Sequence, residues 1–191
     1  MEDFSLHILD IAENCLEAGA KKIDIRVQED GRRDLLVLEI RDDGRGMSKA
    51  LLARAADPYT TTKKAKRIGL GLPFLAQSAR AAGGRLEIRS RPDHGTRIRA
   101  TFGLSHIDLI PLGSVAETLA ALIAGHPEID FTYTHKCGGG RFAFSTRDYR
   151  DQLGGVPLVA PRVLSLIKND INSGLARLRR KRRWNEKLRK S

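Results

Sequence analysis

The chain has 191 residues, of which 41% are hydrophobic and 30% are charged, and its net charge is +11. This length suits one well-packed domain with room for a small second one, and the composition excludes a disordered or membrane-embedded protein. The apolar runs are far shorter than the roughly 20 residues of a spanning helix. Cys15 and Cys137 have no partner spacing for a disulfide framework or a zinc site. We therefore expect a cytoplasmic protein without a membrane span.

Most of the positive charge lies at the C-terminal end. Residues 177–191 contain nine Lys or Arg and one Glu, so this segment carries +8 of the +11. Such a basic tail, which includes Trp184, can bind nucleic acid, an acidic protein or an anionic membrane. It can equally be the solvated end of a helix. The sequence leaves these alternatives open.

The first predicted element is a helix that starts with Ser5 as its N-cap and ends at Gly19, where a positive φ suits a helix C-terminus. One side of this helix is apolar. The other side carries polar residues at helical spacing, namely His7, Asp10, Asn14 and Glu17. Alone, such a stripe is typical of a solvated helix face, and we interpret His7 as a core or site-wall residue.

Alternating apolar residues predict two strands over 23–27 and 36–40 that form a β-hairpin. The second strand ends in the turn Asp42-Asp43-Gly44-Arg45-Gly46. A short helix is predicted over 48–56, and Pro58 stops it before the loop 57–64.

A second long helix follows the glycines at 69 and 71, has Pro73 in its first turn and closes at Gly83-Gly84. Two more strands are predicted over 86–90 and 96–102.

Beyond about Ser105 the pattern changes. A helix over 115–123 precedes two strands, over 129–134 and 142–145, which flank a glycine turn, and the chain ends in a long helix with an apolar stripe to Leu178. We predict three parts: a domain at 1–104, a small α+β partner-binding region at 105–176 and a basic helical tail at 177–191.

Three features of the first hundred residues carry chemistry. Glycines before a helix, as in Gly69-Leu70-Gly71-Leu72, let backbone N–H groups converge on a phosphate. A carboxylate at a strand end, as in Asp42, can accept a hydrogen bond from the amine of an adenine. The amide oxygen of Asn14 is a hard ligand of the kind that Mg²⁺ prefers, and Asp10 can orient or deprotonate a water.

The order of these pieces adds to their individual signals. The segments DIAENCLEAGAKKIDI, RDDGRGM, DPYTTTKK, IGLGLPFLAQ and HGTRIRATF resemble, in the right order, the motifs of the superfamily of gyrase, heat-shock, histidine-kinase and MutL ATPases. The resemblance covers residues 5–104. The first segment is most similar to MutL, and the third and fourth are most similar to sensor histidine kinases.

This resemblance implies a Bergerat-type α/β sandwich, a mixed sheet with helices on one face, that binds ATP with Mg²⁺. By analogy, Asn14 is the Mg²⁺ ligand, Asp42 accepts from adenine, and Thr96 reaches adenine through water. The remaining nucleotide-binding positions implied are Gly44, Gly46 and Met47 in the turn, Lys63 in the loop, and Gly69, Leu70, Gly71 and Leu72 around the phosphates.

One departure concerns catalysis. Asp10 stands where the family has a general-base Glu, and it is one methylene shorter, so we expect hydrolysis to be slow or absent. Since no acceptor His on a preceding helix and no MutL-type arm is evident, we expect a stand-alone ATP-binding regulator of a protein partner. Two alternatives stay open: a protein kinase acting on a separate protein, and a nucleic-acid-associated ATPase that uses residues 177–191.

Overall fold

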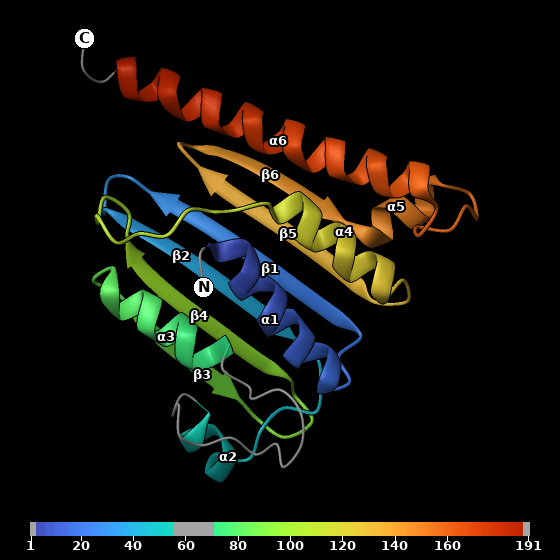
Figure 1. Cartoon of the computed structure of the whole chain (residues 1–191), viewed down its shortest axis with the longest axis horizontal. Helices are drawn as coiled ribbons and strands as arrows, with labels where there is room; N and C mark the ends of the chain where they lie inside the picture. The colour runs from blue at the N-terminus through green and yellow to red at the C-terminus, as the bar shows by residue number, and fades with distance from the viewer. Residues whose placement is uncertain (1–2, 56–70, 189–191) are drawn as a thin grey trace.

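The computed structural model describes residues 3–55 and 71–188, with the side chains in these ranges except those of 54 and 182–188. The predictions for Lys63, Gly69, Leu70 and the loop 57–64 lie outside the described residues. The described chain forms an α/β fold around a six-stranded sheet with the strand order β3-β4-β2-β1-β5-β6 (Figure 1).

The strands are β1 (Lys22–Asp30), β2 (Leu35–Asp42), β3 (Arg85–Ser90), β4 (Thr96–Gly103), β5 (Asp130–Cys137) and β6 (Gly140–Ser145). The helices are α1 (Phe4–Glu17), α2 (Lys49–Arg54), α3 (Gly71–Ala81), α4 (Val115–Gly125), α5 (Thr146–Gln152) and α6 (Pro161–Leu188). Neighbouring strands are antiparallel, except that β1 and β5 are parallel. The sequence does not predict α5, because residues 146–152 have no apolar repeat.

The helices cover one face of the sheet. Figure 1 shows α1, α3 and α4 in front of the strands, and α6 lies along the edge strand β6. Alternation explains which side is buried, since Ile23, Ile25 and Val27 of β1 point toward the helices and are almost fully buried. The mixed sheet with helices on one face confirms the predicted fold class. The opposite face, which we call the open face, has no helix over it among the described residues.

The start of α1 differs from the prediction in its cap. The carboxylate of Asp3, not the hydroxyl of Ser5, accepts the backbone N–H of Leu6, at 3.0 Å. Ser5 lies buried within the first turn, where its hydroxyl donates to Asp3 at 2.6 Å. The predicted end of this helix is confirmed, because Gly19 has a φ of +78°.

Residues beyond Ser105 extend the same sheet. β5 pairs with β1 over the whole of both strands, and a single cluster of buried side chains spans both parts of the chain. The predicted stripe of the last helix is buried at Ile167, Ile171, Leu175 and Leu178. In the described part of the chain, no helix is both long enough and apolar enough to cross a bilayer.

Candidate functional site

Two turns that contain glycine, one with Gly46 after β2 and one with Gly95 between β3 and β4, pack closely against each other at one end of the sheet. We call this contact the lock. Gly46 has a φ of +63°, and a Cβ atom at this position would lie 2.0 Å from the carbonyl oxygen of Arg91. Gly95 has a φ of +71°, and a Cβ atom there would lie 2.0 Å from the carbonyl oxygen of Asp42. The backbone N–H of Asp93 donates to the carbonyl of Arg45 at 2.8 Å. Only glycine at both positions allows the two backbones to approach so closely.

Asp42 lies at the end of β2, inside this lock. Its carboxylate accepts the backbone N–H of Gly44 at 2.9 Å, and it also accepts hydrogen bonds from the thiol of Cys15 and the backbone N–H of Thr96. Burial raises the pKa of Asp42 above its usual range, while these three donors act in the opposite direction. Burial and the nearby Asp42 carboxylate raise the pKa of the Cys15 thiol, which therefore stays protonated.

The neighbouring Asp43 has a different task. Its side chain accepts the backbone N–H groups of Lys21 and Lys22, at 2.7 and 2.8 Å, and so fixes the start of β1. Of the two adjacent carboxylates, Asp43 stabilises the fold by its hydrogen bonds to β1, and Asp42 belongs to the candidate site.

Ser90 connects the other residues of the predicted turn. Its hydroxyl accepts the backbone N–H of Met47 at 2.8 Å, donates to the carbonyl of Gly95 at 2.9 Å and lies 2.9 Å from the hydroxyl of Thr96. Met47 and Thr96 are both half-buried. The structure therefore places Met47, Thr96 and Asp42, three of the predicted nucleotide-binding residues, close together.

The start of α3 abuts the polar side of α1. A Cβ atom at Gly71 would lie 3.0 Å from the Cβ of Asp10, 3.5 Å from the Oδ2 of Asp10 and 3.7 Å from the Nδ2 of Asn14. The amide nitrogen of Asn14 donates to the backbone carbonyl of Asp10 at 2.9 Å. This hydrogen bond leaves the amide oxygen of Asn14 available to another group. Asp10 remains accessible to solvent, and partial desolvation raises its pKa.

The start of α3, at Gly71, lies beside Asp10 and Asn14. The first four N–H groups of a helix have no partner within it, and the helix dipole is positive at this end. The side chain of Leu72 packs against the core, so only its backbone can serve a ligand. The second half of the candidate site thus consists of the N-terminus of α3 together with Asp10 and Asn14 of α1.

His7 couples α1 to α3. Its Nε2 lies 3.2 Å from the hydroxyl of Ser78, and its ring is fully buried. Burial is the main reason that its pKa falls to about 4, and the positive N-terminus adds to the effect. Its Nδ1 has no hydrogen-bond partner among the described residues. His7 is therefore a neutral core residue at ordinary pH, which agrees with its interpretation as a core or wall residue.

Sequence reasoning missed two contributors to this site. Cys15 follows Asn14 in α1 and points the other way, to Asp42, so one helix touches both groups of predicted site residues. No local signal marks this contact. Ser90 shows no signal other than its place just before the turn that contains Gly95.

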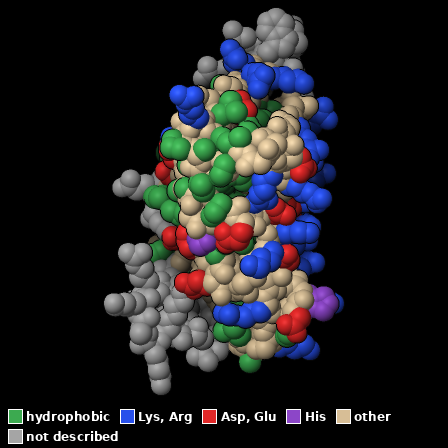
Figure 2. Space-filling model, turned by 90° about the vertical axis from the view of Figure 1, so that its right-hand side faces the viewer, with side chains coloured by type: hydrophobic (Ala, Val, Ile, Leu, Met, Phe, Trp, Pro, Cys, Tyr) green, Lys and Arg blue, Asp and Glu red, His purple; other side chains and the backbone are tan. Residues whose placement is uncertain are grey.

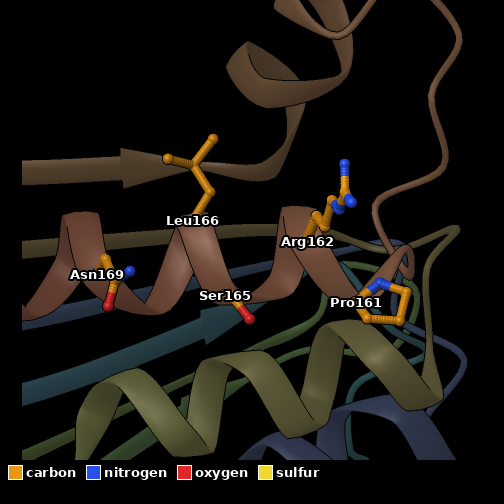
Figure 3. Close-up of a pocket in the computed structure, with 5 residues that line it drawn as sticks. All are labelled: Pro161, Arg162, Ser165, Leu166 and Asn169. Carbon is orange, nitrogen blue, oxygen red and sulfur yellow. The ribbon is translucent and has the colours of Figure 1, made fainter.

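A separate hollow of about 430 Å³ lies on α6. Its lining residues are Pro161, Arg162, Ser165, Leu166 and Asn169 (Figure 3). Figure 3 shows Arg162 and Leu166 on the side of this helix away from α4. Since α6 lies at the β6 edge of the sheet and α3 lies over β3 and β4, this hollow is distinct from the site around Asp42 and Gly71.

Comparison with known proteins defines the class to which this fold and site belong. The family model described as "Histidine kinase-, DNA gyrase B-, and HSP90-like ATPase" matches residues 3–106, more than half of the chain. The chain belongs to this family.

Individual relatives include both sensor kinases and MutL proteins. The sensor protein kinase FleS of Pseudomonas aeruginosa is 39% identical over 58% of this chain, which corresponds to 27% of FleS. The DNA mismatch repair protein MutL of Rhodopseudomonas palustris is 43% identical over 29% of this chain and 9% of its own length. The chain thus spans about a quarter or less of these relatives.

Among solved structures, the MutL ATPase domain of Aquifex aeolicus complexed with ADP has a TM-score of 0.53 with 14% identity, over 82% of this chain and 70% of that one. The N-terminal domain of a DNA repair protein has a TM-score of 0.52 with 13% identity, over 75% of this chain and 52% of that one. Both show the same fold.

We predict that His7 makes the protein sensitive to mild acid. Its folded pKa of about 4 lies below its ordinary value of 6.5, so the unfolded chain binds the proton first as the pH falls. The free energy of unfolding should therefore decrease from about pH 6.5 down to pH 4, by up to about 3 kcal/mol from this group. Urea unfolding of His7→Gln at several pH values should show a decrease that is smaller by about this amount. His94→Gln, at an exposed loop position, should keep the wild-type slope, and equal slopes in all three proteins would contradict the assignment.

Proposed function

We propose that this chain binds ATP with Mg²⁺ at the site between α1, α3 and the locked turns, hydrolyses it slowly or not at all, and uses nucleotide binding to regulate a protein partner. The observation that carries the proposal is the close approach of Gly71 to the side chains of Asp10 and Asn14. Without a side chain at Gly71, the N-terminus of α3 can approach an anionic group, while Asn14 and Asp10 of α1 can hold the accompanying cation and a water.

Asp42 suits the adenine end of the nucleotide. A carboxylate has about four acceptor positions, so its three protein donors leave capacity for one ligand amine. The surrounding backbone is held by Gly46 and Gly95, so Asp42 need not reorganise when a base binds. Such preorganisation reduces the free-energy cost of binding.

The other end suits phosphates and a cation. Backbone N–H groups at the start of α3 can bind phosphate oxygens. Asn14 would hold Mg²⁺ through its amide oxygen, and Mg²⁺ would neutralise phosphate charge there. Among the described residues, no group of three or more His, Cys, Asp or Glu is arranged to hold a metal ion. The fit is therefore one protein oxygen together with oxygens of the nucleotide.

We expect the adjacent aspartates to separate nucleotide binding from folding. Asp42→Asn should weaken Mg·ATP binding by about 100-fold, because it replaces one acceptor oxygen by an NH2 group that cannot accept from the surrounding donors or from the adenine amine, while Asp43→Asn should lower the melting temperature and leave the affinity nearly unchanged. Isothermal titration calorimetry with Mg·ATP and thermal unfolding check both.

Asn14→Ala should reduce ATP affinity with Mg²⁺ and have little effect in EDTA. Absence of saturable ATP binding to the wild type would refute the proposal.

The fate of the terminal phosphate depends on Asp10. Its carboxylate is accessible and close to Gly71, but its side chain is one methylene shorter than Glu. A displacement of about 1 Å can slow a reaction by about 100-fold. Because several relatives are sensor kinases, transfer of the phosphate to a separate protein is the second candidate function.

Lengthening the side chain of Asp10 by one methylene tests whether its distance from the terminal phosphate limits hydrolysis. Asp10→Glu should raise the rate of ATP hydrolysis by about 10- to 100-fold, whereas Asp10→Asn should abolish it, and both should bind ATP with nearly the wild-type affinity. The measurement is the release of labelled γ-phosphate from ATP, with lysate proteins present in a parallel sample. Label that appears on a protein, and is lost in Asp10→Asn, supports the kinase. Equal rates in the wild type and both variants would exclude a role for Asp10.

The region 105–176 offers a surface for a protein partner. Its exposed large apolar side chains include Val156, Val159 and Leu166, and the last of these lines the hollow on α6. Figure 2, which faces the right-hand side of Figure 1, shows hydrophobic side chains gathered on the upper half of this face. An exposed apolar patch of this kind is a feature of binding surfaces.

A nucleotide-dependent partner should depend on this surface. Immobilised full-length chain should retain a protein from a lysate of its own cells in the presence of Mg·ATP and lose it when nucleotide is removed. Leu166→Glu should reduce this retention, because it places a charge in the apolar surface. The matched control is Ile107→Glu, which places the same charge on a 95% exposed apolar side chain that does not line the hollow on α6. Retention of the same proteins with and without nucleotide would contradict a regulatory role.

A further inference from the structure

The open face of the sheet carries a row of arginines. Arg41 of β2 is the cross-strand partner of Arg97 of β4, and Arg97 is the partner of Arg89 of β3. All three side chains point away from the helices, because their neighbours Ile40, Ile98 and Ile88 point toward them. Neighbouring strands are about 4.8 Å apart, so three like charges stand side by side.

This row is costly for the fold. Like charges directly opposite each other destabilise a sheet. Part of the cost is offset by Glu39, which is buried on the same face and accepts from Arg41 at 2.8 Å and from Arg97 at 3.0 Å. Although burial acts to raise the pKa of Glu39, the Arg97 hydrogen bond and the Arg41 charge hold it below the usual range. Glu39 therefore stays ionised, yet it compensates only part of the row.

The surrounding open-face positions of these strands leave the net charge of the row at +3. On β2, β4 and β3 the open face carries five arginines and two glutamates, namely Arg41, Arg85, Arg89, Arg97, Arg99, Glu39 and Glu87. Arg89 forms no salt bridge within the described residues. Figure 2 shows Lys and Arg side chains along its right-hand side, which is the side behind the sheet in Figure 1.

A small hollow lies within this surface. It has a volume of about 110 Å³ and is lined by Glu87, Arg89, Arg97 and Arg99. Since one water occupies about 30 Å³, the volume of the hollow is sufficient to admit a phosphate group. Guanidinium groups bind phosphate oxygens in pairs, which makes arginine well suited to this task.

The composition of the face favours one kind of polyanion. Protein interfaces have an apolar centre, but none of the exposed large hydrophobic side chains of the described residues lies on a strand. Surfaces for single-stranded nucleic acid stack bases on aromatic rings, and no aromatic residue occupies an open-face position of the described strands. A charged face without exposed large apolar or aromatic side chains matches a double helix, which presents its phosphates outward and keeps its bases stacked.

We propose that the arginine row Arg41–Arg97–Arg89 binds the phosphate backbone of double-stranded nucleic acid, with little preference for sequence. This surface is separate from the basic tail at 177–191. It lies behind the candidate nucleotide site, since Arg41 directly precedes Asp42 and Arg97 directly follows Thr96. A duplex on the open face therefore need not displace a nucleotide on the helical face.

The test is fluorescence anisotropy of a labelled 20-base-pair duplex with the full chain. The three phosphate contacts of the row should contribute about 40-fold to the fall in affinity between 50 and 200 mM NaCl. Arg89→Ala should weaken binding at 50 mM by about tenfold, which is the contribution of one contact. Glu87→Gln removes an opposing charge and should tighten binding, an effect that a misfolded variant cannot produce.

Arg33→Ala is the matched control, because it removes the same charge from a side chain that is 80% exposed. It lies in the turn before β2, about 20 Å along the strand from Arg41, and should leave the affinity unchanged. Equal losses in Arg33→Ala and Arg89→Ala would overturn the proposal in favour of the tail or of overall charge. Failure to bind the duplex, with Arg89-dependent binding to phosphatidylserine vesicles or to polyglutamate, would overturn it in favour of a membrane or an acidic protein.

Discussion

The contact on which the candidate site depends is the lock between the two glycine turns. Gly46 lies against the carbonyl of Arg91, and Gly95 lies against the carbonyl of Asp42, at distances that no Cβ atom permits. Because these turns end β2 and connect β3 to β4, the position of Asp42 follows from the pairing of three strands. A group held in this way is as rigid as the sheet, and strand ends are more precise supports for a site than free loops.

Helix α1 connects this lock to the second half of the site. The thiol of Cys15 donates a hydrogen bond to Asp42, while the preceding Asn14 faces the start of α3. His7 then ties α1 to α3 through Ser78. The two halves are therefore joined by one helix whose buried side is apolar and whose other contacts are polar.

Much of this arrangement can be predicted from local patterns. The alternation of apolar residues predicts the strands, and the fixed order of five short motifs predicts the candidate site. What could not be predicted rests on contacts between distant residues: the pairing of β5 with β1, the bond from Cys15 to Asp42, and the alignment of Arg41, Arg97 and Arg89. The cap of α1 was wrong for a more local reason. Asp3 and Ser5 are both good caps, and only packing decides that Ser5 is buried.

The parallel pairing of β1 with β5 has a consequence for any attempt to divide the chain. The family match ends at residue 106, but β1 is an interior strand whose second neighbour comes from residues 130–137. A fragment cut at the family boundary would leave the length of β1 as a bare edge, beside apolar surface that α4 and α6 normally cover. Exposed edges of this kind pair with other chains. Such a fragment would therefore tend to aggregate, although it contains all of the sequence motifs.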